Sequence, residues 1–416
     1  MMGEDGTPVS VLSGALGAGK TTTLNHLLSN PGDRTVAVLV NDMGALNVDA
    51  ELIEAQGDGI TELSNGCICC DLRDDLEVAV SRLARTGEFD HLVVESSGIS
   101  APTPVARLFT TGPASAPYRL DTLVTVVDAS SFRETLADDD IVTTEDIRRQ
   151  RPGQAETDDE VRPLSDLLVT QAEHADVLLV NKCDLAEESD IAETEALLAA
   201  LNPDARQYRT TRGQVSPEAI LGTRLFSPET LQESEQRKRA LEHADGGAAA
   251  SAHAGADDYD HDHDGHVHDP AEAYGVTSFA FESRRPLHPG RFLEFLRSLP
   301  ESVIRSKGIV WVAGREDLAL RYTGTGAVRR VIGREPWVAS MPEHRQQTQR
   351  RMRPDLPWDG EVGDRRTELV VIGREMDDQS LRAALADCEL TDEEMDADRD
   401  AFENPFPEEE SQELTV

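Results

Sequence analysis

The chain has 416 residues and a formal net charge of −39. Acidity of this strength, without a basic stripe to neutralise phosphates, excludes a nucleic-acid binder. It is typical of halophilic proteins from a salt-rich cytoplasm, where salt screens the repulsion between carboxylates. The chain has no apolar run of about twenty residues, and its first residues lack the basic and apolar regions of a signal peptide. We therefore expect a soluble, cytoplasmic protein of two or three domains.

The first predicted elements are a strand, a glycine-rich loop and a helix, within the segment VSVLSGALGAGKTTTL at residues 9–24. The loop matches the pattern GxxxxGK[ST], and its residues are Gly14, Ala15, Leu16, Gly17, Ala18, Gly19, Lys20 and Thr21, followed by Thr22. Glycines let successive backbone N–H groups point at phosphate oxygens, and the helix N-terminus adds a partial positive charge. We predict that these residues bind a nucleotide, that Lys20 reaches its phosphates and serves catalysis, and that Thr21 binds Mg²⁺.

The second predicted strand, at residues 35–40, leads into the loop NDMGALNVD at residues 41–49. In phosphate-loop enzymes the loop after the second strand commonly senses the γ-phosphate and Mg²⁺. Asp42 and Asp49 are therefore candidate carboxylates on the magnesium side of the site. An ordinary acidic turn is the alternative interpretation.

Three of the five cysteines crowd together as Cys67, Cys69 and Cys70. In a reducing compartment such crowding indicates metal or redox chemistry rather than a disulfide framework. Thiolates suit zinc, Cu(I) or cobalt better than magnesium, and three sulfurs leave a fourth coordination position open, as a transfer site needs. We predict a site for one of these metals here. A redox or sulfur-relay role and inert buried cysteines are the alternatives.

The third predicted strand, at residues 91–95, ends in a carboxylate. In the sequence HLVVESSGISAP, apolar residues run directly into Glu95. A carboxylate at the end of a strand beside a phosphate loop is placed to organise Mg²⁺ or the attacking water. We therefore predict a catalytic role for Glu95.

The base-recognition motif follows the fifth predicted strand. A fourth strand is expected at residues 122–127, and a fifth, at residues 176–180, runs into Asn181, Lys182, Cys183 and Asp184. The Asp184 carboxylate can accept hydrogen bonds from both N–H groups of a guanine edge, which adenine does not offer. We therefore predict GTP as the nucleotide, bound through Asn181, Lys182 and Asp184.

Together these motifs resemble the CobW-type metallochaperone GTPases, relatives of the hydrogenase and urease nickel-insertion GTPases. The resemblance rests on GALGAGKT, NDMGALNVD, NGCICC, ESSGISAP and NKCDL, and continues in SFAF, RSKG and the segment from Glu368 to Cys388. One departure is Asp42, where the family usually has Glu. The resemblance implies an α/β P-loop NTPase domain with a mainly parallel sheet, followed by a smaller α+β C-terminal domain.

The composition divides the chain into four parts. We predict a GTPase domain at residues 1–226 with a solvated acidic insertion at about 138–160, a disordered linker rich in His and Asp at 227–275, and a CobW-type C-terminal domain at 276–392. Residues 393–416 are expected to be a solvated or disordered acidic tail. In the C-terminal domain we expect strands at 276–281, 308–313, 318–323 and 368–372, and helices near 291–299 and 379–387.

The linker contains a histidine tract, DHDHDGHVHD, with His261, His263, His266 and His268. Four imidazoles among carboxylates can hold Zn²⁺, Ni²⁺ or Co²⁺ in many loose arrangements. We interpret the tract as a tether that collects zinc loosely, as the resemblance also implies. A merely solvated linker is the alternative.

The resemblance implies a GTP-dependent metallochaperone that captures a transition metal, zinc above all, with the three clustered cysteines and delivers it to a client metalloprotein. GTP hydrolysis would drive release. Alternatives are a cobalt-handling accessory protein of cobalamin synthesis, a zinc buffer with GTP as a state sensor, and an iron–sulfur ATPase, against which Asp184 argues. The expected cofactors are GTP, Mg²⁺ and Zn²⁺ or Co²⁺. The expected partner is the client protein, with a homodimer left open and with neither nucleic acid nor membrane.

Overall fold

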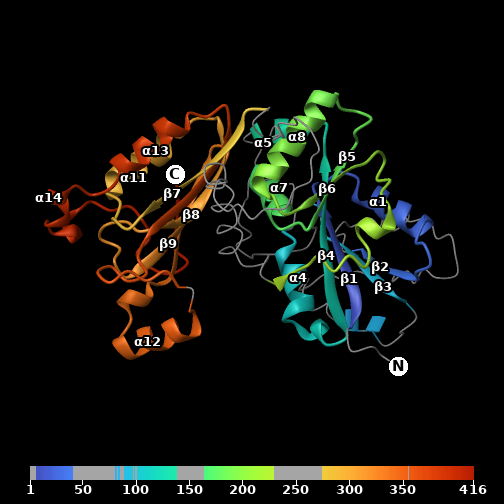
Figure 1. The fold of residues 1–416 in the computed structure, drawn as a ribbon, viewed down its shortest axis with the longest axis horizontal. Coiled ribbons are helices and arrows are strands. Elements are labelled where there is room, and N and C mark those ends of the chain that lie inside the picture. Colours follow the sequence, from blue (N-terminus) through green and yellow to red (C-terminus); the bar gives the residue numbers. More distant parts are fainter. Residues whose placement is uncertain are drawn as a thin grey trace, which may run out of the picture. The chain divides into compact units, whose positions relative to one another are not determined.

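The structure is a computed structural model that describes residues 6–40, 80–81, 83–84, 89–96, 98, 101–137, 164–228, 274–354 and 356–416. The chain divides into two compact units, Met1–Gln236 and Arg237–Val416. Each unit contains a six-stranded sheet in its described part (Figure 1). Among the helices of the described residues, none combines the length and the apolar character needed to cross a membrane.

The N-terminal unit alternates strands and helices in its described part. Its elements are β1 (Thr7–Gly14), α1 (Lys20–Ser29), β2 (Val36–Val40), β3 (His91–Glu95), α4 (Thr103–Thr110), η1 (Pro113–Ser115), β4 (Tyr118–Asp128), α5 (Phe132–Ala137), α7 (Leu164–Glu173), β5 (Val177–Asn181), α8 (Glu188–Leu201), β6 (Arg206–Arg209) and η2 (Pro217–Ala219).

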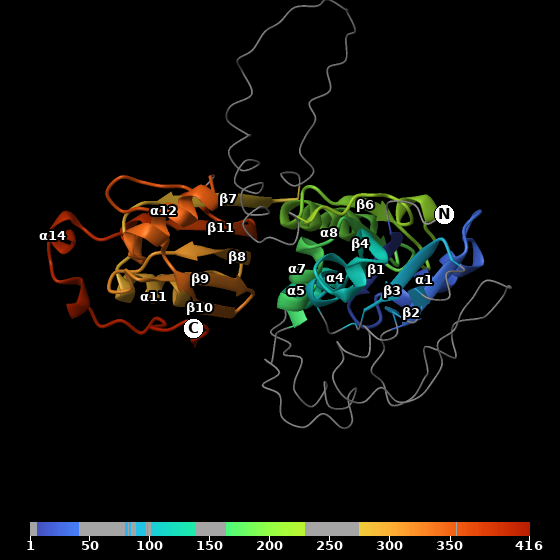
Figure 2. The ribbon, with the colours of Figure 1, turned by 90° about the horizontal axis from the view of Figure 1, so that it is seen from below.

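The sheet of this unit has the strand order β2-β3-β1-β4-β5-β6, and every pairing is parallel. Its central strands are buried on both faces, which explains why their sequences are continuous apolar runs rather than alternating ones. Leu24 and Leu27 of α1 pack on one face, and Val105 and Phe109 of α4 belong to the core cluster on the other. Figures 1 and 2 show α1 and α4 on opposite sides of β1. The predicted phosphate-loop fold with a parallel sheet is confirmed.

The C-terminal unit is built around an antiparallel sheet. Its elements are β7 (Val276–Ser283), α11 (Pro289–Ser298), β8 (Val303–Val310), β9 (Leu318–Thr325), β10 (Val328–Pro336), η4 (Val338–Ser340), α12 (Glu343–Met352), β11 (Thr367–Arg374), α13 (Asp378–Asp387), α14 (Asp392–Met395), η5 (Arg399–Ala401) and β12 (Glu413–Thr415).

The strand order in this sheet is β12-β10-β9-β8-β11-β7, and β7, β11, β8, β9 and β10 follow one another in Figure 2. Apolar residues of one face pack against α11 and α13 in a single core that includes Phe279, Phe292, Leu320 and Leu385. The α+β prediction for this unit is confirmed.

One predicted strand of the C-terminal unit is displaced. The apolar run at residues 308–313 predicted a strand there, but β8 spans Val303–Val310. Residues 311–313 instead bond to the segment before α11, because Leu287 N–H donates to Trp311 O at 2.8 Å and Ala313 N–H donates to Leu287 O at 2.9 Å. Both the end of β8 and the segment 311–313 are largely buried, so the run is apolar throughout. The periodicity of the sequence therefore cannot show where the strand ends.

The acidic tail was expected to be solvated or disordered, and this prediction is wrong. β12 pairs antiparallel with β10 through Val331 and Leu414, and Phe406 is buried in the core of the unit. The Arg315 guanidinium donates to the carbonyls of Phe406 and Pro407. A few apolar side chains and one arginine therefore fix a segment whose overall composition is that of a solvated tail.

Changing Phe406 to Leu should lower the free energy of unfolding by about 1–2 kcal/mol, because a fully buried ring is replaced by a smaller side chain that leaves part of the space empty. Chemical denaturation at high KCl would measure the loss. The matched change Phe402→Leu, at a half-buried ring of the same segment, should lower stability by less. Equal losses for the two variants would contradict the role of Phe406 as the anchor.

Candidate functional site

The phosphate loop connects β1 to α1 at the carboxyl edge of the parallel sheet. Gly14 has φ +140°, and a Cβ added there would lie 2.3 Å from the Val126 carbonyl oxygen. Gly19 has φ +107°, directly precedes α1, and a Cβ there would lie 2.3 Å from Asn181 Nδ2. Both positions therefore require glycine. Gly14 approaches β4 closely, and Gly19 approaches the base motif.

The Lys20 ammonium is buried at the phosphate loop. Its Nζ donates to the carbonyl oxygens of Gly14 at 2.9 Å and Ala15 at 3.1 Å. Carbonyls of the loop thus hold the ammonium where the loop and the first turn of α1 converge. A compact positive charge in this place suits the binding of phosphate oxygens.

Thr21 and Glu95 meet across the sheet edge. The Thr21 hydroxyl donates to Glu95 Oε1 at 3.2 Å, and Glu95 is buried at the end of β3, the neighbour of β1. Two oxygen ligands next to a phosphate loop have the hard character that Mg²⁺ prefers. The structure therefore brings together Thr21, predicted to bind Mg²⁺, and Glu95, predicted to organise Mg²⁺ or the attacking water.

Asn181 ties the base motif to the phosphate loop. Its Nδ2 donates to Ala18 O at 2.9 Å, while its Oδ1 accepts from the Thr210 hydroxyl at 3.0 Å and from Gly213 N–H at 2.9 Å. Asn181 is thus a buried structural link between three segments. The loop of residues 210–213 beside it was not predicted as part of the site, because β6, which precedes it, is a short polar strand (RQYR) without a strand pattern.

Lys182 and Asp184 lie in the turn after β5. Lys182 has φ +61°, and its Nζ forms an ion pair with Asp128 Oδ2 at the end of β4, at 2.6 Å. Burial tends to raise the pKa of Asp128, but hydrogen bonds from Lys182 and Ser130 outweigh it, and the pKa is lowered.

Asp184 is exposed, and its neighbour Leu185 is 69% exposed, so the Asp184 carboxylate is accessible to a nucleotide base. The sequence did not identify Asp128 as the partner of Lys182.

The segment after β3 touches the phosphate loop. Ser96 N–H donates to Leu12 O at 2.9 Å, and a Cβ added to Gly98 would lie 2.8 Å from Leu16 N. Gly98 is the glycine of ESSGISAP, so its small size is required for this close approach. A movement of this segment would therefore displace residues of the phosphate loop.

Several predicted site residues lie outside the described residues. They are Asp42 and Asp49, the metal-site candidates Cys67, Cys69 and Cys70, and the histidines His261, His263, His266 and His268. Within the ranges that the structure describes, no three His, Cys, Asp or Glu side chains come together as a metal site. The predicted metal residues accordingly stay predictions.

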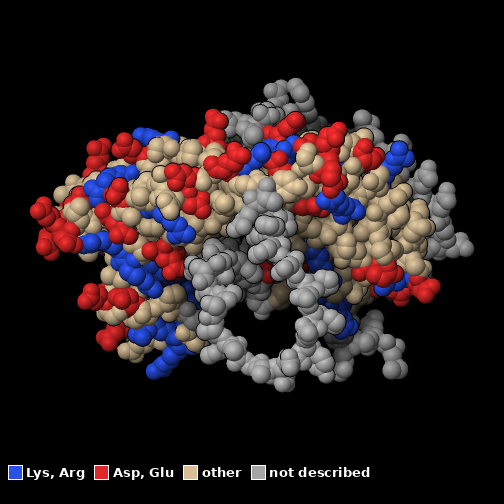
Figure 3. All heavy atoms as spheres, turned by 45° about the horizontal axis from the view of Figure 1, so that its top comes forward, with Lys and Arg blue, Asp and Glu red and all other residues tan. Residues whose placement is uncertain are grey.

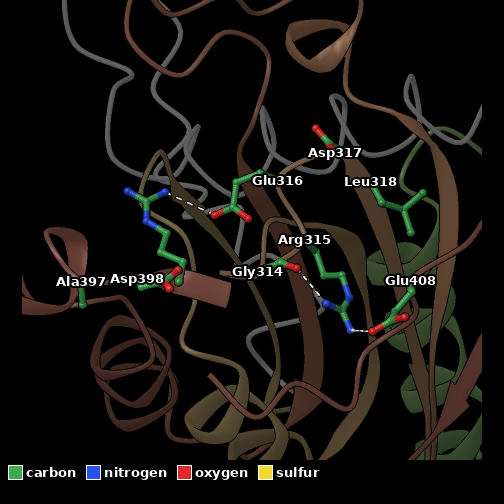
Figure 4. A pocket seen from close by; sticks show the side chains of 9 residues that line it. Gly314, Arg315, Glu316, Asp317, Leu318, Ala397, Asp398 and Glu408 are labelled. Carbon is green, nitrogen blue, oxygen red and sulfur yellow. Dashed lines mark hydrogen bonds and ion pairs between the residues drawn. The ribbon is translucent and has the colours of Figure 1, made fainter. Parts of the chain in front are cut away.

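A pocket of about 610 Å³ lies in the C-terminal unit, lined by residues 314–318, 397–399 and 408 (Figure 4). Its two guanidinium groups are engaged by the chain itself. Arg315 donates to Glu408 at 2.9 Å and to carbonyls of the tail, and Arg399 pairs with Glu316 at 3.4 Å. We interpret these contacts as the fastening of the C-terminal segment rather than as a ligand site.

The comparisons with known proteins agree over nearly the whole chain. Residues 8–209 match the CobW/HypB/UreG nucleotide-binding domain, and residues 276–389 match the cobalamin synthesis protein CobW C-terminal domain. The zinc-regulated GTPase metalloprotein activator 1 of Dictyostelium discoideum is 35% identical over 94% of this chain and 82% of its own. The zinc chaperone CobW of a Sinorhizobium species is 27% identical over 91% of this chain and 96% of its own.

Among solved structures, the Zn(II)-bound YjiA GTPase from E. coli aligns over 93% of this chain and 100% of its own, with 20% identity and a TM-score of 0.37. Because this TM-score is low, the family assignment is based on the domain matches and on the relative from Dictyostelium. Phosphate loop, base motif and C-terminal domain agree with that assignment. The chain belongs to the CobW/HypB/UreG family of P-loop GTPases and carries the CobW C-terminal domain.

Proposed function

We propose that this protein is a GTP-dependent metallochaperone that captures zinc and delivers it to a client metalloprotein. The observation that carries the proposal is the sequence identity of 35%, over 94% of the chain, to a relative named a zinc-regulated GTPase metalloprotein activator. The nucleotide site supports the GTP-dependent part, because its phosphate loop, buried carboxylate and base motif lie at one sheet edge.

The nucleotide half of the proposal assigns roles to the described residues. Lys20 binds the β- and γ-phosphates, and Asp184 selects guanine by accepting from its two N–H groups. Thr21 and Glu95, whose oxygens lie 3.2 Å apart, would hold Mg²⁺, which when bound neutralises charge on the phosphates. Glu95 is buried beside the phosphate loop and places its carboxyl group next to the site of hydrolysis.

The metal half assigns zinc, as cargo, to Cys67, Cys69 and Cys70. Three thiolates within four residues suit zinc, and the cysteines lie in the sequence between β2 and β3, the two strands that lead into the phosphate side of the site. Nucleotide-dependent movement between these strands would then change the grip on the metal. By reciprocity, any factor by which GTP tightens zinc binding is also the factor by which zinc tightens GTP binding.

Zinc affinity measured by chelator competition at high KCl tests the proposal. We expect the full-length protein with a non-hydrolysable GTP analogue and Mg²⁺ to bind zinc at one site at least about tenfold more tightly than with GDP, which is about 1.4 kcal/mol of coupling. Equal affinities at several sites would instead indicate a zinc buffer in which the histidine tract dominates.

The matched control is a variant with Cys67→Ser, Cys69→Ser and Cys70→Ser. It should lose the tight zinc site and keep the GTP affinity that the unaltered protein has in the absence of zinc. If it lost both together, the cysteines would be structural, and the assignment of the cargo site would be wrong. A rise in GTP turnover when a metal-free client is added would separate delivery from storage.

A further inference from the structure

Helix α12 carries a concentration of positive charge that is unusual for this chain. The segment from Glu343 to Arg353 has the sequence EHRQQTQRRMR, with four arginines and one carboxylate, in a chain whose net charge is −39. No residue of the helix is buried. In Figure 1 α12 lies well away from α11 and α13, and in Figure 3 blue side chains gather at the lower edge of the C-terminal unit, where α12 lies.

The arginines of α12 differ from many others in the same unit. Arg285, Arg291 and Arg366 form ion pairs with Asp392, Glu394 and Glu368. Among the described residues, the guanidinium groups of the α12 segment, those of Arg345, Arg350, Arg351 and Arg353, have no carboxylate partner. In so acidic a protein, partners for a guanidinium are abundant. Arginines kept apart from them are therefore available to carboxylates of another molecule.

Contacts on one side of the helix fix its orientation. Gln346 Nε2 donates to Ala339 O at 3.1 Å and to Met341 O at 2.8 Å, and the Arg350 guanidinium lies 4.3 Å from the centroid of the Trp358 ring. Gln346 and Arg350 are four residues apart and so share one face of the helix. This face holds α12 in place without burying an apolar side chain.

The opposite face combines arginine with an exposed methionine. His344, Thr348, Arg351 and Met352 have the spacing of one helical face, and all four are exposed. Met352 is 73% exposed, and Arg345, one heptad before it, lies on the same side of the helix, two turns away. Protein interfaces are enriched in Met and Arg and depleted in Lys, Glu and Asp, and this face has the same composition.

We propose that the outward face of α12 is a docking surface for an acidic surface of a partner protein. Its arginines would pair with carboxylates of the partner, and Met352 would contribute an apolar contact. A nucleic acid is disfavoured, because phosphates need no apolar contact, whereas this face includes the exposed Met352, a residue type that is enriched in protein interfaces. The proposal is independent of the nucleotide site and stands whether or not zinc delivery is the function.

Binding of a fluorescein-labelled acidic peptide, built from Glu and Leu heptads, to the full-length protein tests the proposal by fluorescence anisotropy. The double variant Arg345→Gln/Arg351→Gln should bind this peptide at least about tenfold more weakly than the unaltered protein, and raising the KCl concentration should reduce the difference. Met352→Ser should also weaken binding of the peptide. Failure of the unaltered protein to bind the peptide, or unchanged binding by Met352→Ser, would overturn the proposal.

The matched control is Arg297→Gln/Arg334→Gln. Both arginines are exposed in the C-terminal unit, and neither has an ion-pair partner among the described residues, so this variant has the same change in charge. The control should bind the peptide within about twofold of the unaltered protein, a difference well below 1 kcal/mol. Equal weakening of both variants would reveal general electrostatics and overturn the proposal. So would a single-stranded RNA of equal charge that bound more tightly than the peptide through Arg345 and Arg351.

Discussion

Changing Asp184 to Asn is expected to replace the preference for GTP by a preference for XTP. A carboxylate accepts from the N1–H and the 2-amino group of guanine, whereas an amide offers one acceptor and one donor. The donor would face the guanine amino group and leave both unsatisfied, but it would match the 2-oxo group of xanthine. A site whose polar groups are left unpaired discriminates strongly, so we expect GTP affinity to fall about a thousandfold.

Competition of GTP and XTP against a fluorescent nucleotide would measure this change. Asp184 is exposed, so the substitution should not alter folding. Asp204→Asn, at another exposed aspartate of the same unit, is the matched control and should leave both affinities unchanged. If Asp184→Asn bound GTP as tightly as the unaltered protein, Asp184 would not read the base, and the assignment of the nucleotide would lose its residue-level basis.

The strands that carry the nucleotide site could be predicted from the sequence because their surroundings are simple. β3 and β5 are buried along their whole length, so their sequences are apolar runs that end abruptly at a polar residue. In a parallel sheet the carboxyl ends of such strands share one edge. This geometry alone brings Glu95 and Asn181 toward the phosphate loop, and the structure agrees.

Contacts made by polar segments could not be predicted in the same way. The loop of residues 210–213 holds Asn181, but it follows an edge strand whose residues are polar and partly exposed. The ion pair between Lys182 and Asp128 joins residues 54 positions apart, and its existence depends on β4 and β5 being neighbours. Such contacts follow from the order of strands, which a single sequence does not encode locally.

The C-terminal segment was misjudged for a related reason. Its composition is acidic, and only a few apolar residues, Phe406 among them, enter the core. Composition averages over these positions, whereas stability depends on them individually. The local group of arginines on α12 was missed for the same reason, because the net charge of −39 describes only the whole chain.

Changing Glu95 to Gln should lower the GTP turnover number about a hundredfold with little change in nucleotide affinity. Glutamine is nearly isosteric and retains an oxygen that can accept from the Thr21 hydroxyl, as Glu95 Oε1 does at 3.2 Å. The change therefore removes the charge while keeping the local packing. Loss of a charged or polar group aimed at the reacting phosphate commonly lowers turnover by this amount. Release of inorganic phosphate under saturating GTP would measure it.

A stability measurement on the same variant separates function from structure. A buried carboxylate carries a desolvation penalty, so its neutral isostere should leave the free energy of unfolding unchanged or raise it. Glu173→Gln, at another buried carboxylate of this unit, is the matched control and should leave turnover unchanged. A Glu95→Gln variant with lower stability and full turnover would mean that the charge serves the fold. Lower turnover with undiminished stability would mean that the charge is kept at this position for hydrolysis.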